Sequence, residues 1–221
     1  MIMDWSPLWI SLKIAAVSTF FVFVSGVIAA KGVTSMKKGK SIIDGILSLP
    51  LVLPPTVLGF FLLMLFGKNS GMGQFLDSAG VNVIFTWQGA AIAAAVASFP
   101  IMYRTVRGAF EQVDRELVDA ARQLGCSRAQ TFFYVWIPLA WNGIASGITM
   151  SFARALGEFG ATIMIAGNLP GKTRTMSVAV YTAMQSGNRE LALKWTVVIL
   201  SLSLISLVAI NFITGIQYKD R

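Results

Sequence analysis

Long runs of apolar residues alternate with short polar connections along most of the chain. The longest apolar runs cover residues 8–30, 42–66, 87–103, 139–167 and 191–213. About 20 apolar residues in an α-helix, rising about 1.5 Å each, cross the hydrocarbon core of a bilayer. The first run is too long for a signal peptide, and no basic region precedes it. The pattern therefore predicts an all-α integral membrane protein with about five transmembrane helices in a single domain, residues 1–221.

The composition agrees with this prediction and narrows the classes of function. Of the 221 residues, 55% are hydrophobic and only 13% are charged, whereas ordinary soluble domains have about 25% charged residues. The net charge of +8 does not indicate a nucleic-acid partner, because the charges lie at the ends of the apolar runs. Cys126 is the only cysteine and there is no histidine, so we expect no intrachain disulfide and no metal site built from these residues.

The basic residues predict the orientation of the chain, because cytoplasmic loops carry an excess of Lys and Arg. With the amino terminus outside and the carboxyl terminus in the cytoplasm, the inward segments hold eleven of them: Lys31, Lys37, Lys38, Lys40, Arg104, Arg107, Arg115, Arg122, Arg128, Lys219 and Arg221. The outward segments then hold four: Lys68, Lys172, Arg174 and Arg189. The opposite orientation would reverse this bias, so we expect the first one.

The second apolar run contains several residues that break helices. Pro50, Pro54 and Pro55 lie close together and are followed by Thr56. Each proline removes a backbone donor and crowds the preceding turn, so the freed carbonyls need protein or water partners instead of lipid. Transporters use such broken helices along the substrate path. We therefore take these four residues as candidates for the translocation path or its gate, with a purely structural kink as the alternative.

Two ionisable residues lie within the fourth apolar run. Arg154 and Glu158 are four residues apart, so they can pair along one face of a helix. Because charges at membrane depth are costly, such residues are functional candidates by default. We expect Glu158 to be neutralised by Arg154 and to shape a gate, with Thr162 offering a hydroxyl to the pathway. A membrane-embedded enzyme is disfavoured, because Glu158 has no second carboxylate in its span and no histidine can act as a base.

The segment 168–190 has polar ends and a short apolar centre. We predict a re-entrant or surface helix there, and a further span remains the alternative. Lys172 and Arg174 would lie on the outer side, where they either attract anions to the mouth of the pathway or border lipid headgroups.

The most polar long segment, residues 108–138, separates the third and fourth runs. Its first part has the spacing of an amphipathic helix, with apolar residues at Phe110, Val113, Leu117, Ala120, Ala121 and Leu124. Asp114 can cap the start of this helix, and Gly125 suits a left-handed end. A second helix is predicted after Ser127, which forms a capping-box pattern with Gln130. Such a pair of helices between membrane spans is typical of a loop that docks against a soluble protein.

This segment resembles the EAA loop of ABC-importer permeases, whose pattern is EAA, three residues, Gly, nine residues, Ile, one residue and Leu-Pro. The corresponding positions here are Asp119, Ala120, Ala121, Gly125, Val135, Ile137 and Pro138. The first, fifth and sixth of these depart from the pattern within their chemical class. The resemblance implies a type I ABC-importer permease fold, in which residues 108–138 form a cytoplasmic coupling loop that docks on a separate ATPase. The implied coupling residues are Glu116, Asp119, Ala120, Ala121, Arg122, Gly125, Arg128, Ile137 and Pro138.

Two other stretches resemble those of molybdate permeases of the ModB type, LPLVLPP at residues 49–55 and RALGEFGAT at residues 154–162. The resemblance covers nearly the whole chain and implies molybdate as the substrate, with sulfate or tungstate as alternatives. It also implies a location in the bacterial cell membrane and a homodimer of permease chains. Two cytoplasmic ATPase subunits would hold ATP and Mg²⁺, and an external molybdate-binding protein would contact Lys172 and Arg174.

No catalytic residue and no cofactor are expected in this chain, because the resemblance assigns hydrolysis to the partner ATPase. The alternative of a different class is an ATP-independent channel or secondary transporter. Such a protein could have the same spans and the same broken helix, but it would have no use for a docking loop.

Overall fold

The computed structural model describes residues 4–36 and 38–218, so Lys37, Lys219 and Arg221 of the orientation count lie outside the described residues. Every regular element of the described chain is a helix. In order these are α1 (Ser6–Thr34), α2 (Lys40–Val52), α3 (Pro55–Phe66), α4 (Gly71–Ser78), α5 (Trp87–Glu111), α6 (Arg115–Gln123), α7 (Arg128–Thr131), the π-helix η1 (Phe132–Trp136), α8 (Ile137–Leu139), α9 (Trp141–Leu156), α10 (Gly160–Ala166), α11 (Met176–Gln185) and α12 (Arg189–Tyr218). This is the all-α fold that the apolar runs predict.

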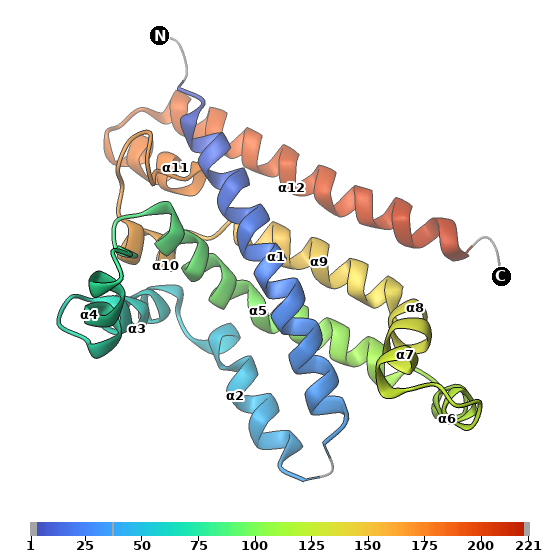
Figure 1. Ribbon diagram of the computed structural model, residues 1–221. Helices are drawn as coiled ribbons and strands as arrows, with labels where there is room; N and C mark the ends of the chain where they lie inside the picture. The colour runs from blue at the N-terminus through green and yellow to red at the C-terminus, as the bar shows by residue number, and fades with distance from the viewer. Residues whose placement is uncertain (1–3, 37, 219–221) are drawn as a thin grey trace.

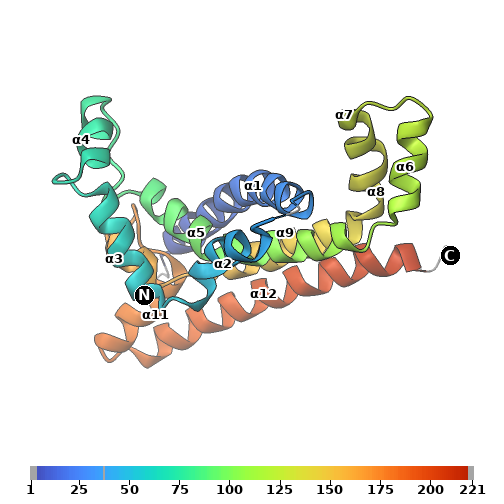
Figure 2. The same ribbon diagram turned by 90° about the horizontal axis from the view of Figure 1, so that it is seen from below.

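Three helices, α1, α5 and α9, pack together at the centre of the bundle, and α12 lies along one flank (Figures 1 and 2). Small side chains let these helices approach closely. Ser18 on α1 and Ser98 on α5 are fully buried, and each hydroxyl donates to a carbonyl of its own helix at 2.7 Å. The hydroxyls of Ser18 and Ser98 are therefore paired, so these two polar groups can be buried between the helices.

Three helices are long and apolar enough to cross a membrane, namely α1, α5 and α12 over Arg189–Val208. The pair α2 and α3 passes the same test but is bent by 107°. Pro50 lies inside α2, and the break comes after it, at Leu53 and Pro54. Leu53 is extended, as a residue before proline prefers, and Pro55 occupies the first turn of α3, where its missing N–H costs nothing. The predicted broken helix is confirmed.

The expectation of one continuous helix over residues 139–167 is wrong. α9 ends at Leu156, and Gly157, Glu158 and Phe159 separate it from α10. The reason is local: the Glu158 carboxylate accepts a hydrogen bond from the Ala161 N–H at 2.8 Å and so satisfies a free donor at the start of the next helix. This run therefore also forms two half-helices.

The segment 168–190 forms only one short helix, α11, of 10 residues. At about 1.5 Å per residue this covers about half of a bilayer core. Its first residue, Met176, donates its N–H to Ser11 Oγ on α1 at 2.8 Å, which fixes α11 against the bundle. The structure agrees with a re-entrant or surface helix, and α11 is too short for a further span.

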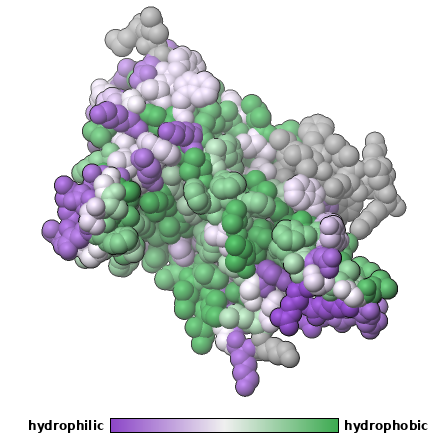
Figure 3. Space-filling model, viewed as in Figure 1, coloured by the Kyte–Doolittle hydropathy of each residue, from purple (hydrophilic) through white to green (hydrophobic). Residues whose placement is uncertain are grey.

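Hydrophilic residues gather at the two ends of the molecule, and the middle of the visible face is mainly apolar (Figure 3). One end carries α6, α7 and α8 together with the last turns of α1 and α5 and the start of α2 (Figure 1). We refer to it as the coupling end. The opposite end carries the start of α1, α4 and α11. The candidate functional residues therefore fall into three groups: the coupling end, the opposite end and the broken helices between them.

Candidate functional site

The segment at the coupling end has the helix signals that the sequence predicts. The Asp114 side chain accepts a hydrogen bond from Glu116 N–H at 2.9 Å and caps α6. Gly125 follows the end of α6 with φ +88°, a left-handed conformation that favours glycine. Ser127 and Gln130 form a reciprocal capping box at the start of α7. The two helix starts and the glycine turn are confirmed, and together they build a helical hairpin that projects from the bundle (Figure 2).

The apolar face predicted for a single helix over residues 110–124 is divided in the structure. Phe110 belongs to α5, and a turn precedes α6. Val118 faces the body of the protein and is 5% exposed, whereas Leu117 and Leu124 are 51% and 86% exposed. The buried side of α6 differs from the predicted one, because α6 packs against the bundle through Val118. Two leucines of the hairpin therefore remain available to another protein.

Aromatic contacts fix the hairpin to the membrane helices. Phe110 at the end of α5 is buried, and its ring meets those of Phe132 and Trp136 edge-on, with centroids 6.1 and 5.5 Å apart. Lys31 Nζ at the end of α1 lies 3.1 Å from the centroid of the Trp136 ring. Such edge-on and cation–π contacts hold rings in one orientation. A displacement of the hairpin would therefore also displace the ends of α1 and α5.

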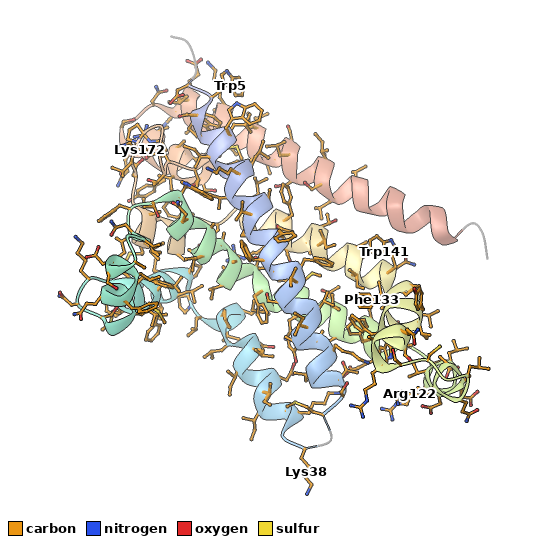
Figure 4. The ribbon with its side chains drawn as sticks, viewed as in Figure 1. Trp5, Lys38, Arg122, Phe133, Trp141 and Lys172 are labelled. Carbon is orange, nitrogen blue, oxygen red and sulfur yellow. The ribbon has the colours of Figure 1, made fainter. Side chains whose placement is uncertain are left out.

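The outer surface of the hairpin mixes charged and apolar side chains. The predicted coupling residues Glu116, Asp119, Ala120, Arg122, Gly125, Arg128 and Pro138 are exposed, and Ala121 and Ile137 are partly exposed. Arg122 and Phe133 are labelled on this segment in Figure 4, and Phe133 and Tyr134 are also largely exposed. The closest ion pair within the group, Arg122 with Asp119, is loose at 3.9 Å. These charges are free to pair with a partner.

The two broken helices meet in the bundle. A Cβ added at Gly160, the first residue of α10, would lie 2.7 Å from Pro55 Cβ on α3, and one at Gly59 would lie 2.8 Å from Ala161 Cα. Since real Cβ contacts are longer than this, the backbones approach as only glycine permits. The breaks predicted near Pro54 and found near Glu158 are therefore neighbours in space, although about a hundred residues separate them in the sequence.

Arg154 and Glu158 are brought together as predicted, with Arg154 Nη1 2.7 Å from Glu158 Oε2. Arg154 lies on α9 and Glu158 in the break that follows it, so the pair does not lie along one helix face. Glu158 is buried and also accepts the N–H of Ala161, so both carboxylate oxygens have partners. Thr162 is 1% exposed and lies inside the bundle, whereas Thr56 at the start of α3 is exposed.

The opposite end holds the predicted binding-protein contacts. Lys172 is exposed, and Figure 4 shows it at the end of the molecule away from Arg122. It lines a cavity of about 380 Å³ together with Lys13, whose Nζ lies 3.6 Å from the centroid of the Trp87 ring. Arg174 is less free, because its Nε donates to Asn168 Oδ1 at 2.7 Å. Lys172 is therefore the more accessible of the two predicted contacts.

A charge cluster between α2 and α5 was not predicted. Asp44 on α2 pairs with Arg107 on α5 and accepts a hydrogen bond from Tyr103 Oη at 3.0 Å. Glu111 at the end of α5 accepts from Arg107 Nε at 3.0 Å and from Lys40 Nζ at 2.6 Å. Sequence reasoning treated the basic residues here only as markers of span ends. The available signal was Asp44, an acid within an apolar run. Like Glu158, it could have been taken as a functional candidate because a charge at membrane depth is costly.

Within residues 4–36 and 38–218, no three His, Cys, Asp or Glu side chains are grouped to hold a metal ion. The functional features of the described chain are thus an exposed hairpin, two adjoining broken helices and a basic surface at the far end. This arrangement can join a membrane pathway to a soluble partner.

Comparison with known proteins identifies relatives over nearly the full length. The chain is 42% identical to the putative molybdenum transport system permease protein YvgM of Bacillus subtilis (strain 168), covering 91% of this chain and 90% of that protein. It is 41% identical to the molybdenum transport system permease protein ModB of Escherichia coli (strain K12), covering 97% and 95%. The sulfate transport system permease protein CysT of Salmonella typhimurium (strain LT2) is 35% identical, with coverage of 95% and 80%.

Solved structures confirm the expected type I ABC-importer permease fold. An inward-facing structure of the MetNI methionine ABC transporter matches with a TM-score of 0.73 at 19% identity, covering 95% of this chain and 93% of that chain. A bacterial ABC transporter that imports alginate matches with a TM-score of 0.73 at 15% identity, covering 97% and 78%. The family model of the binding-protein-dependent transport system inner membrane component matches residues 22–219, and the chain belongs to this family.

Proposed function

We propose that this protein is the membrane permease subunit of an ATP-driven ABC importer for molybdate. It forms the oxyanion pathway and couples it to a separate ATPase. The observation that carries the proposal is the helical hairpin, which exposes Leu117 and Leu124 beside charged side chains while Val118 fixes it to the bundle. The choice of molybdate as the substrate is supported by relatives named as molybdenum permeases, which are 41% and 42% identical to this chain.

The assembly contains two copies of this chain, two cytoplasmic ATPase subunits and an external molybdate-binding protein. ATP and Mg²⁺ bind to the ATPase subunits, and the permease itself catalyses no reaction. The chain crosses the bacterial cell membrane several times, with the amino terminus outside and the carboxyl terminus in the cytoplasm. The excess of Lys and Arg among the residues at the coupling end supports this orientation.

Coupling follows from the attachment of the hairpin. When the ATPase subunits close on ATP, they displace α6, and the contacts of Phe110 and Trp136 pass this displacement to α5 and α1. Through α8 it also reaches α9, whose far end stops at the break around Glu158. Because that break adjoins the start of α3, a movement of α9 changes the packing of the two half-helices. The pathway thereby opens alternately to each side of the membrane.

A dianionic substrate constrains the groups along its route. Fixed negative charge would repel molybdate, and Glu158 is the carboxylate next to the breaks. Its pairing with Arg154 and the Ala161 N–H removes most of that repulsion. Thr56 is exposed at the start of α3, where its hydroxyl and the positive end of the helix dipole favour an anion.

Uptake by reconstituted vesicles tests the proposal. The permease, its ATPase and the binding protein are combined, and molybdate accumulation is measured with and without ATP. We expect accumulation that requires ATP and co-purification of the ATPase with the permease. Uptake that is independent of ATP would instead identify a channel or a secondary transporter.

Competition experiments address the substrate. Sulfate is the second candidate, because a sulfate permease is 35% identical over 95% of this chain. We expect tungstate to inhibit molybdate uptake and sulfate not to inhibit it. Stronger inhibition by sulfate than by tungstate would reassign the substrate while leaving the ATP-driven mechanism intact.

A further inference from the structure

The two halves of the bent helix are attached to the bundle in different ways. In α3, Leu58, Gly59 and Leu62 are buried and pack closely against α10. In α2, all 13 residues are described and none is fully buried. Ile43 and Leu47 pack against the bundle while partly exposed. With fewer apolar contacts, α2 is the half that can move, and the bend at Leu53 and Pro54 is the joint about which it would move.

Polar contacts hold the free end of α2. Lys40 and Asp44 are one turn apart and face α5. Arg107 lies between the two acids of the charge cluster, since it pairs with Asp44 on α2 and with Glu111 at 3.0 Å on its own helix. Tyr103 is fully buried and donates its hydroxyl to Asp44, so the acceptor is held in place from a rigid position. One guanidinium thus joins two helices through directional charged hydrogen bonds.

The charge cluster also adjoins the coupling hairpin. Glu111 is the last residue of α5, and Asp114, the cap of α6, follows after a short turn. Asp44, Arg107 and Glu111 line one cavity of about 950 Å³, and the same cavity is lined by α6 residues Arg115, Asp119 and Arg122. The start of α2, the end of α5 and the start of α6 therefore meet at one place.

We infer that Arg107 is a positioning residue that makes the start of α2 move together with the end of α5 and with α6. Movement imposed on the hairpin then rotates α2 about the joint at Leu53 and Pro54. The angle between α2 and α3 therefore changes when the coupling end moves. This inference rests on the proposed function, since it concerns how ATPase movement reaches the pathway. It assigns to Arg107, Asp44 and Glu111 a role in coupling that is separate from substrate contact.

Transport measured per ATP hydrolysed tests the inference in vesicles that contain the complete importer. Asp44→Asn and Arg107→Gln are each expected to lower molybdate uptake per ATP about five-fold or more, as typical for a lost coupling between sites. The double variant should be no worse than the more impaired single variant, because both remove the same contact. Arg107→Lys keeps the charge and should recover part of the loss. The control Lys194→Gln removes an exposed pair with Glu190 on α12 and should leave the ratio unchanged.

Two outcomes of this experiment would overturn the inference. One is normal uptake per ATP in Asp44→Asn, which is informative even if Arg107→Gln does not assemble, because α2 has no buried residue. The other is a loss in the double variant that equals the product of the two single losses, which would show that the residues act independently.

A distance measurement separates this inference from the proposed function. Spin labels are placed at Ile46 on α2 and at Gln112 after α5, both exposed, in a Cys126→Ser background, and labelled chain is diluted with excess unlabelled chain so that an assembly holds one labelled copy. We expect one narrow distance distribution that is the same with and without ATP, and a broader one in Asp44→Asn. Identical distributions in parent and variant would refute the connection of α2 to α5 through Arg107, even if the protein imports molybdate. The expected distributions without molybdate uptake would instead refute the proposed substrate and leave this connection supported.

Discussion

Arg154 Nη1 lies 2.7 Å from Glu158 Oε2, and this ion pair joins the last turn of α9 to the break between α9 and α10. Glu158 is buried whereas about a third of the Arg154 side chain is exposed. The acid therefore depends on the pair more than the base does, since a buried carboxylate without a cation is strongly disfavoured. The break is held by a contact that a single substitution can remove.

Replacing Glu158 by Gln keeps an acceptor for the Ala161 N–H but leaves Arg154 without its partner. We expect Glu158→Gln to reduce stability by about 1–3 kcal/mol, the range for a group that loses a charged hydrogen-bond partner. Molybdate uptake should also fall, because the geometry of the break changes. Thermal unfolding of the purified permease and uptake in vesicles measure the two effects. The double variant Arg154→Gln/Glu158→Gln should recover part of the stability, and unchanged assembly and transport in Glu158→Gln would contradict this role.

Gly125 allows a direct test of the hairpin as the coupling element. Its φ of +88° is tolerated by Asp at a cost of about 1–2 kcal/mol, and a Cβ there meets nothing within 4 Å in this chain. Gly125→Asp should therefore insert and fold, but its carboxylate would face the docked ATPase. We expect ATP hydrolysis to continue while molybdate uptake falls to the level seen without ATP.

The control for this prediction is Gly125→Asn, which has nearly the same size and the same tolerance of the left-handed conformation but no charge. Uptake by Gly125→Asn above that of Gly125→Asp would assign the defect to the charge at the interface. Normal uptake by Gly125→Asp would show that this face of the hairpin does not dock.

Features fixed by neighbours in the sequence could be predicted well. The cap at Asp114, the capping box of Ser127 with Gln130 and the left-handed Gly125 each depend on groups within a few residues. The break near Pro54 is equally local, because proline restricts its own backbone and that of the preceding residue. The resemblance of residues 108–138 to the EAA loop likewise pointed to the family without knowledge of any long-range contact.

Features fixed by tertiary packing could not be predicted in the same way. Periodicity placed Leu117 on the apolar face of this helix, and only the contact with the bundle decides that Val118 is buried instead. The Glu158 carboxylate stabilises its break through a nearby N–H, but the place of α10 beside α3 depends on tertiary packing, which no spacing within residues 139–167 reveals. Asp44 and Arg107 are 63 positions apart, so neither could be assigned as the partner of the other.

The contact between α3 and α10 predicts a sharp difference between two neighbouring glycines. A Cβ at Gly160 would lie 2.7 Å from Pro55 Cβ, whereas one at Gly157 meets nothing closer than Ala153 O at 3.7 Å. We expect Gly160→Ala to lower stability by about 1–3 kcal/mol, the cost of overpacking, and to reduce uptake. Gly157→Ala is the matched control and should change stability by less than about 1 kcal/mol. Equal melting temperatures for the two variants would show that the half-helices are not in tight contact.

The opposite end predicts where the external binding protein docks. Lys172 is exposed and shares its cavity with Lys13, so Lys172→Glu should weaken docking by about two- to ten-fold, given the small energy of exposed ion pairs. The effect should diminish at high salt, because exposed charges are screened. Binding of labelled receptor to permease vesicles at low and high salt measures both effects. Lys38→Glu changes the net charge equally at the coupling end and should leave docking unaffected. Equal affinity for the Lys172→Glu and parent proteins at low salt would show that Lys172 is not part of the docking surface.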